Sequence, residues 1–226
     1  EYLNMKRVFA LLEVFIVVAS VSLAQRITPR GPFVLNLDYA KFRNNDSTGY
    51  LEIYYGFYPR LISYDFRGGG YVGALAVHTG LKDKRTDMYI VSDRSSVPVL
   101  IADTSSASLR STFVSQKGYA LPFGDYTLEV VVIDSLTPAR RDSIALPISV
   151  NAYATTVVSS DLELCSNIGT SDQKNDMFFK NSLEVMPNPT LVFGVASHPM
   201  MFSYAEIYNL DPEHTYTVKT QVVAQD

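Results

Sequence analysis

Cysteine, histidine and tryptophan are scarce in this sequence of 226 residues, which has one cysteine, three histidines and no tryptophan. A single cysteine excludes an internal disulfide and any zinc site with several cysteine ligands. Nineteen lysines and arginines against 23 aspartates and glutamates give a net charge of −4. The basic surplus that favours binding to a phosphate backbone is absent, so nucleic acid is not an expected partner. These shortages leave little material for chemistry, and we predict a non-enzymatic protein with no catalytic, cofactor-binding or metal-binding residue and no cofactor.

Apolar and aromatic residues, in contrast, are plentiful. Hydrophobic residues make up 47% of the chain and charged residues 19%, a balance typical of a folded protein that buries a core. Fifteen tyrosines and twelve phenylalanines accompany them. Aromatic side chains are enriched in β-strands, so this composition favours an aromatic-rich β protein.

The N-terminal 24 residues have the pattern of a secretory signal peptide. Met5 is followed by two basic residues and then by an apolar run over residues 8–18. Small residues at Ser22 and Ala24 occupy the positions that signal peptidase reads. The apolar run is shorter than the roughly 20 residues of a bilayer-spanning helix, so cleavage after Ala24 leaves no stable membrane span. Residues 1–4 precede the methionine and resemble translated leader sequence.

Beyond the leader, an alternation of apolar and polar residues with a period of two recurs, without sustained helical periodicity. Between Tyr50 and Phe57, every second residue from Leu51 onward is apolar and belongs to one face. Further short strands are predicted at residues 61–66, 71–79, 87–92, 97–102, 126–134 and 144–150. Short strands separated by turn signals are typical of antiparallel sandwiches. We predict an all-β fold with tandem immunoglobulin-like, Greek-key antiparallel β-sandwiches after an N-terminal signal helix.

Two segments, 121–134 and 210–226, resemble copies of one element. Each begins with leucine, a proline and an acidic turn, and continues with Tyr-Thr and an aliphatic stretch. The copies predict that Tyr126 and Tyr216 begin equivalent strands. A tyrosine in this place resembles the tyrosine corner of Greek-key sandwiches, whose hydroxyl group bonds to nearby backbone.

This repeat also divides the chain into domains. We predict a first β-sandwich domain at residues 26–151 and a second at residues 152–226. In the first domain a further strand follows the tyrosine strand, whereas the second copy ends at Asp226. An unpaired sheet edge is normally covered in a finished protein. We therefore expect the second domain to be truncated before its last strand.

The segment Gly68-Gly69-Gly70-Tyr71-Val72-Gly73 matches the dinucleotide fingerprint letter by letter. In nucleotide-binding proteins these glycines lead into a helix whose N-terminus faces the pyrophosphate. Here a strand-like alternation follows, and we interpret the segment as a glycine-rich hairpin turn. Cys165 lies in another alternating segment and is expected to be a small core residue.

Three tyrosines, Tyr50, Tyr54 and Tyr58, are candidates for an interaction face. Exposed, they would bind a sugar or a peptide. Tyrosines in such a pattern more often fill the space between two sheets. Both interpretations stay open at this point, with packing favoured over binding.

Several segments of the second half stand in a fixed order. They are Ser-Asp-Leu-Glu-Leu at 160–164, Lys-Asn-Ser-Leu-Glu-Val-Met-Pro-Asn-Pro at 180–189, Phe-Gly at 193–194 and Tyr-Ala-Glu-Ile-Tyr-Asn-Leu at 204–210. Together they resemble the N-terminal region of GWxTD domain-containing proteins, a family of exported bacterial proteins. The family's C-terminal Gly-Trp-x-Thr-Asp module is absent here, because the chain has no tryptophan. The resemblance implies export and a sandwich fold, and it provides no enzymatic activity and no functional residue to transfer.

Pro187 and Pro189 enclose a single asparagine. Proline disfavours helix at its own position and at the preceding residue, so we predict a rigid, non-helical turn of structural importance. Tyr126 and Tyr216 are the other residues for which we expect a structural role.

The features above predict an exported, non-catalytic protein of the bacterial envelope, periplasmic or associated with the cell surface. Its tandem sandwiches would serve as spacers or protein-interaction modules, with protein partners in the envelope. One alternative is a carbohydrate- or peptide-binding module that uses the tyrosine-rich face. Another is the non-catalytic portion of a larger envelope enzyme.

Overall fold

The computed structural model describes residues 26–105, 109 and 112–223 of the chain. Within them the fold is all-β, built from antiparallel strands, with a short 3₁₀ turn at Pro59–Leu61. This confirms the predicted fold class. The predicted signal helix lies outside the described residues. No helix in this part of the chain is long and apolar enough to cross a membrane.

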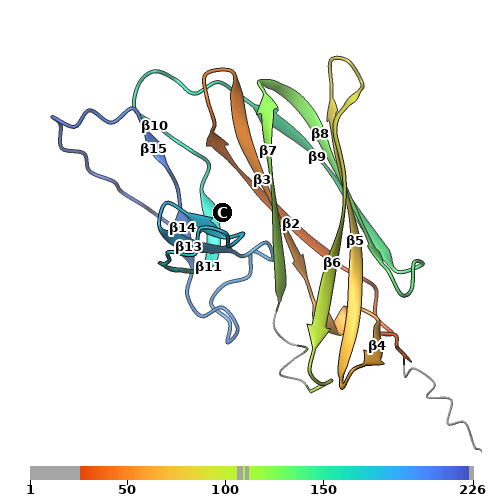
Figure 1. Cartoon of the computed structure of the whole chain (residues 1–226). Helices are drawn as coiled ribbons and strands as arrows, with labels where there is room; N and C mark the ends of the chain where they lie inside the picture. The colour runs from red at the N-terminus through yellow and green to blue at the C-terminus, as the bar shows by residue number, and fades with distance from the viewer. Residues whose placement is uncertain (1–25, 106–108, 110–111, 224–226) are drawn as a thin grey trace, which may run out of the picture.

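The first half forms a sandwich of two sheets (Figure 1). The larger sheet has the order β1-β4-β5-β8-β9, with β6 paired to the other side of β5. Its strands are β1 (Arg26–Ile27), β4 (Tyr64–Arg67), β5 (Gly70–Asp83), β6 (Tyr89–Ile101), β8 (Gly124–Asp134) and β9 (Arg141–Val150). The smaller sheet has the order β2-β3-β7, with strands β2 (Leu35–Arg43), β3 (Thr48–Phe57) and β7 (Phe113–Pro122).

The core of the sandwich follows the alternation read from the sequence. On β3, every second side chain from Leu51 to Phe57 is buried and points between the sheets. On β8, the same holds from Tyr126 to Val132. A side chain of this size contributes roughly 1.5–3 kcal/mol when it leaves water, so the two strands hold the sheets together.

The glycine cluster forms the turn between β4 and β5. Gly68 and Gly69 both have positive φ, at 58° and 86°, a backbone conformation that glycine adopts without a Cβ clash. Arg67 pairs with Gly70 across the hairpin, and β5 continues as a strand. The interpretation as a hairpin turn is confirmed.

A fully buried carboxylate fastens one end of the sandwich. Oδ2 of Asp134 accepts the backbone N–H of Ser63 at 2.8 Å, and Oδ1 accepts that of Leu136 at 3.0 Å. The Arg140 guanidinium lies 3.8 Å away and donates to the carbonyls of Pro29, Gly31 and Leu61. The β8–β9 turn and the loops flanking β2 and β4 are thereby held as one unit.

The second half forms a smaller sheet with the order β12-β13-β11-β14 and a separate two-stranded ribbon, β10-β15. The strands are β10 (Val158–Ser159), β11 (Glu163–Thr170), β12 (Phe179–Lys180), β13 (Leu183–Pro187), β14 (Phe202–Tyr204) and β15 (Ile207–Tyr208). Figure 1 shows this half beside the β2-β3-β7 sheet. The expected boundary at residues 151 and 152 lies in the loop between β9 and β10.

The two halves share a hydrophobic cluster. Ala40, Phe42 and Tyr54 come from the outer face of β2 and β3, and they pack with Cys165, Val185 and Tyr204 of the second half. The smaller sheet of the sandwich is therefore covered on both faces, by the larger sheet on one side and by the second half on the other.

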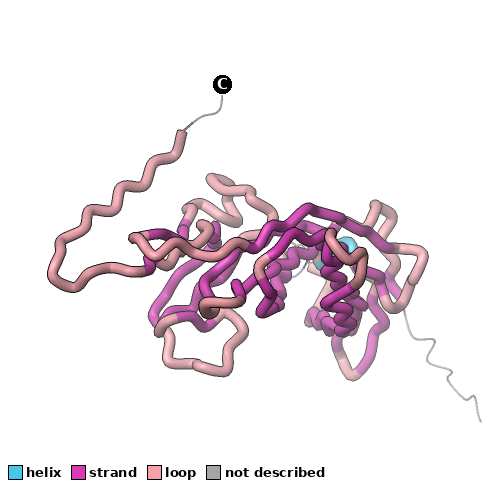
Figure 2. Tube along the Cα trace, turned by 90° about the horizontal axis from the view of Figure 1, so that it is seen from above, coloured by secondary structure: helices cyan, strands magenta, loops and turns pink. Residues whose placement is uncertain are grey.

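The predicted equivalence of Tyr126 and Tyr216 is wrong. Tyr126 lies in β8 and is buried, whereas Tyr216 lies in a loop and is 41% exposed. After β15 the chain runs as a loop away from the sheets (Figure 2). The aliphatic side chains of Val218 and Val222 are exposed there. Alternation alone does not form a strand where no neighbouring strand supplies hydrogen bonds and a surface for burial.

Candidate functional site

The tyrosine face predicted from the sequence lies mostly beneath the second half of the chain. Tyr54 on β3 is completely buried and Tyr50 is half-buried. Tyr58, just beyond the end of β3, is half-buried, and the Arg60 guanidinium lies 4.4 Å above its ring. The three tyrosines thus do not form an exposed platform. Tyr54 packs against residues of the second half, so its ring is not available to a ligand.

A buried group of charges lies at the junction of the two halves. Glu52 and Tyr54 are neighbours on the outer face of β3, and Glu163 begins β11. The ammonium group of Lys180, on β12, contacts Glu52 Oε2 and lies 2.5 Å from Glu163 Oε2. The Tyr54 hydroxyl group donates to Glu52 Oε2 at 2.9 Å. We call these four residues the junction cluster.

A tight hairpin places Lys180 in the junction cluster. Asn181 and Ser182 connect β12 to β13 and both have positive φ, 49° and 66°. Two such residues are the signature of the type I′ turn, whose twist matches that of antiparallel strands. Lys180 pairs with Leu183 directly at this turn. Its backbone is thus fixed, and its side chain extends toward β3.

Burial changes the acid–base properties of the junction cluster. The side chains of Lys180 and Glu163 are 9% and 0% exposed. Burial raises the pKa of Glu163, and the neighbouring Lys180 only partly opposes this shift. Burial and the two nearby carboxylates raise the pKa of Tyr54 far above its usual range, so its phenol stays protonated and donates. One oxygen of Glu163, Oε1, has no hydrogen-bond partner among the described residues.

Aromatic rings surround the ammonium group of Lys180. Nζ lies 4.8 Å from the ring centroid of Phe42 and 5.4 Å from those of Tyr54 and Tyr204. Such contacts stabilise a cation by about 0.5–2 kcal/mol each and at the same time exclude water. The cluster is therefore a charged site enclosed by aromatic rings.

A second polar network borders the cluster on the side of β14 and β15. Oε1 of Glu206 accepts the Tyr204 hydroxyl group at 2.9 Å and the Asn181 side-chain amide at 3.1 Å. Its Oε2 accepts the Tyr208 hydroxyl group at 2.7 Å. The Tyr208 oxygen in turn accepts the backbone N–H of Arg43 at the end of β2 at 3.0 Å. This network fixes the ribbon of the second half to the first half.

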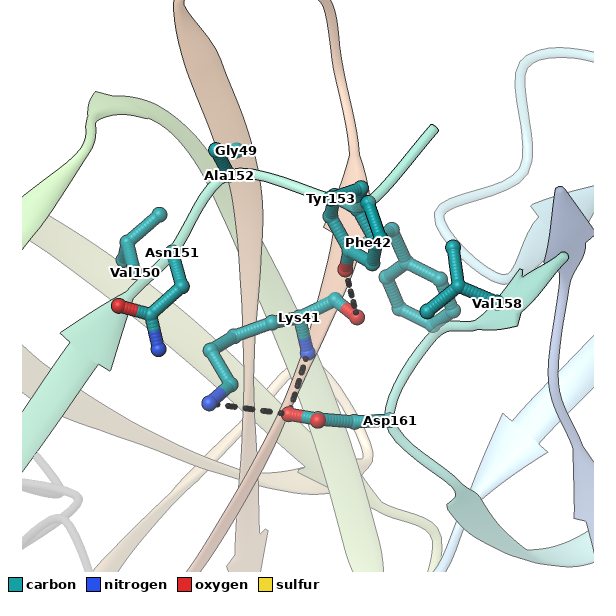
Figure 3. A pocket seen from close by; sticks show the side chains of 10 residues that line it. Lys41, Phe42, Gly49, Val150, Asn151, Ala152, Tyr153, Val158 and Asp161 are labelled. Carbon is teal, nitrogen blue, oxygen red and sulfur yellow. Dashed lines mark hydrogen bonds and ion pairs between the residues drawn. The ribbon is translucent and has the colours of Figure 1, made fainter. Parts of the chain in front are cut away.

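A pocket of about 310 Å³ opens beside the segment that joins the halves (Figure 3). Asp161 Oδ2 accepts the backbone N–H of Lys41 at 3.1 Å and lies 3.6 Å from its Nζ. The Tyr153 hydroxyl group donates to the Lys41 carbonyl at 3.0 Å, and burial raises the pKa of Tyr153 to about 12. These hydrogen bonds hold the connecting segment against β2.

The turn between the two prolines is buried against β3. Pro187 ends β13, Asn188 and Pro189 follow it, and the Asn188 backbone N–H donates to the Leu164 carbonyl at 2.9 Å. A Cβ atom on Gly56 of β3 would lie 2.8 Å from Pro189 Cγ. The turn thus needs a glycine beneath it, and it forms a second point of close contact between the halves.

The remaining candidates from the sequence occupy structural positions. The Tyr126 hydroxyl group donates to the Pro122 carbonyl at 2.7 Å, the contact that defines a tyrosine corner. Cys165 is fully buried, and burial raises the pKa of its thiol. Across the described ranges, no group of three histidine, cysteine or acidic side chains is placed to hold a metal ion.

Sequence reasoning missed the junction cluster. Its charged members are separated by 128 and 17 positions along the chain, and no motif links them. One signal was present, because Glu52 stands between Leu51 and Ile53 in a strand whose other face is also aromatic. Such a strand is buried on both faces, and a charge within it needs a partner.

Comparisons with known proteins do not assign the chain to a family. No family model matches the sequence, and no curated protein matches it. Among solved structures, a crystal structure of a Bordetella pertussis protein provisionally assigned as ApaA is similar over 54% of this chain and 94% of that chain. The identity is 12% and the TM-score 0.30, values too low to support a conclusion about this chain.

Proposed function

We propose that the chain is an exported, non-catalytic protein of the bacterial envelope, whose two β units together serve as a spacer or protein-interaction arm. The export pattern of residues 1–24 and the resemblance to the N-terminal region of GWxTD domain-containing proteins support the compartment. The shared core and the junction cluster support a rigid arm, because a buried contact of this kind restrains motion between the two halves.

The junction is the observation that carries the proposal. Domains joined by a small polar contact are expected to move against each other, whereas a large apolar contact holds them. Here aromatic side chains of β2 and β3 are buried by the second half, and Lys180 binds acidic residues of both halves. The alternative of a sugar- or peptide-binding tyrosine face loses support, because Tyr54 is already buried within the chain.

Export is tested by fusing residues 1–24 to a reporter enzyme that is active only outside the cytoplasm. We expect reporter activity from this fusion and none from a control that lacks the apolar run of residues 8–18. Equal activity from the two fusions would contradict export through this segment.

The rigid arm is tested by cutting the chain with a protease in the loop of residues 151–157. We expect the two fragments to stay together in native buffer and to separate in urea. Fragments that separate without denaturant would refute a stable junction, whatever the result of the export assay.

A further inference from the structure

The junction cluster contains two carboxylates, one more than is needed to neutralise the charge of Lys180. Lys180 carries one positive charge, and Glu52, which also accepts the Tyr54 hydroxyl group, is enough to balance it. Glu163 is a second carboxylate at the same ammonium group, with Nζ and Oε2 2.5 Å apart. Its other oxygen has no partner in the described part of the chain. A buried, half-satisfied carboxylate is costly, so its presence calls for a chemical explanation.

The exclusion of water around this pair favours its neutral form, and this opposes the attraction of the three rings for the ammonium group. The rings of Phe42, Tyr54 and Tyr204 enclose Nζ, and the side chain of Glu163 has no exposure. Transfer of a proton from Lys180 to Glu163 reduces the number of buried charges from three to one. It places an amine directly beside a carboxylic acid. Burial raises the pKa of Glu163, which is the direction that this transfer requires.

We propose that the junction cluster is a self-modification site, at which Lys180 and Glu163 condense to form an isopeptide bond with Glu52 as the proton carrier. The three groups needed for amide formation are an amine, an acid and a base, and all three are in contact. Tyr54 is a positioning residue, because its hydroxyl group holds Glu52 Oε2 at 2.9 Å.

The reaction balances without a co-reactant. Lys180 first gives one proton to Glu163. The lone pair of Nζ then attacks Cδ of the protonated Glu163 carboxyl group, while Glu52 accepts a proton from Nζ. The tetrahedral intermediate reforms its C=O bond, and its hydroxyl group takes the proton from Glu52 and leaves as water. One C–N bond forms, one C–O bond breaks, and Glu52 returns to a carboxylate.

The bond would tie two strands that do not pair directly. β11 and β12 both pair with β13, one on each side, so an amide between Glu163 and Lys180 would span the sheet. The enclosed loop contains the whole connection from β11 to β12. The second half would then keep this part of its sheet even where hydrogen bonds break.

Intact mass spectrometry of the purified chain tests the bond directly. We expect a mass about 18 Da, one water, below that of the same chain without the bond. Trypsin should then fail to cut after Lys180 and release a branched peptide that joins residues 142–174 to residues 175–219. A chain with the unmodified mass would overturn the proposal, and this measurement depends on no variant.

Two variants test whether Lys180 is the lysine that condenses with loss of water. Lys180→Arg keeps the cation and removes the condensing amine, so its mass should show no loss. Lys41→Arg, at the other lysine of the junction, should keep the loss in full. A loss that persists in Lys180→Arg would overturn the proposal. A branched peptide that contains residues 44–60 in place of 142–174 would overturn the assignment of Glu163 as the acid.

Discussion

Replacing Asp134 by alanine removes the acceptor on which one end of the sandwich depends. Three backbone N–H groups, of Ser63, Leu136 and Thr137, donate to its carboxylate, and Ser63 is as fully buried as Asp134. A hydrogen bond to a charged group contributes about 1.5–3 kcal/mol, and a buried donor without a partner pays its full desolvation cost. We therefore expect Asp134→Ala to lower the free energy of unfolding by about 3–5 kcal/mol, a large fraction of a domain's stability.

Urea unfolding followed by far-UV circular dichroism measures this loss, since the chain has no tryptophan for fluorescence. The transition midpoint should fall while the slope with denaturant stays unchanged. In a thermal scan, the same loss corresponds to roughly 6–20 °C for a chain of this length. Asp46→Ala, at a side chain that is 98% exposed, is the matched control and should change stability by less than about 0.5 kcal/mol. Equal midpoints for the two variants would refute the reasoning.

Three further predictions concern the junction, the turn and an acid-sensitive pair. Lys180→Met should unfold about 3–5 kcal/mol more easily than Lys180→Arg in urea, because only methionine leaves two buried carboxylates without a cation. Gly56→Ala should cost about 1–3 kcal/mol in thermal melting, since its Cβ meets Pro189, and an unchanged melting temperature would contradict the packing. The Arg26 guanidinium holds the pKa of Asp65 below its ordinary value of 3.8. The ion pair therefore stabilises the folded state above pH 3.8, and this stabilisation is lost as the pH falls through the lowered pKa. Asp65→Asn should flatten the acid limb of a stability–pH profile, and an unaltered limb would exclude the pair as its cause.

The sequence predicted the strands whose inner face carries an unbroken row of apolar side chains. On β3 and β8, apolar side chains alternate along the inner face, and both strands form where the alternation lies. β6 unites two predicted strands into one, because the polar residues 93–96 between them interrupt the apolar pattern without ending the strand. Pro98 lies within β6, at the edge of the sheet. Proline lacks an N–H group, which an edge strand does not need on its open side.

Two strands of the smaller sheet were missed for a different reason. β2 carries Ala40 and Phe42 on the face that the second half covers, so its two faces are alike in polarity and the period of two is blurred. β7 contains Gly118 at its middle, where a Cβ atom would overlap the hydroxyl group of Tyr50. Glycine weakens a strand pattern in sequence, yet here it makes room for a neighbouring side chain.

The sequence hinted at a buried charge at Glu52 but could not identify its partners, because the burial of the junction cluster depends on a contact between distant parts of the chain. Alternation placed Glu52 on the face of β3 opposite the core, which is ordinarily the solvent face. That face is covered by β11 and β12, and only this covering brings Glu163 and Lys180 to Glu52.

The cluster shared between the halves also sets an order of events during folding. Half of its buried members, Ala40, Phe42 and Tyr54, belong to β2 and β3, so the second half has no complete core until that hairpin exists. The hairpin has only local contacts and leaves the ribosome before the second half does. It can therefore form before β11 to β14 emerge and provide the surface on which they pack. A destabilising substitution in β3 is thus expected to impair two steps, the folding of the sandwich and the later assembly of the second half on it.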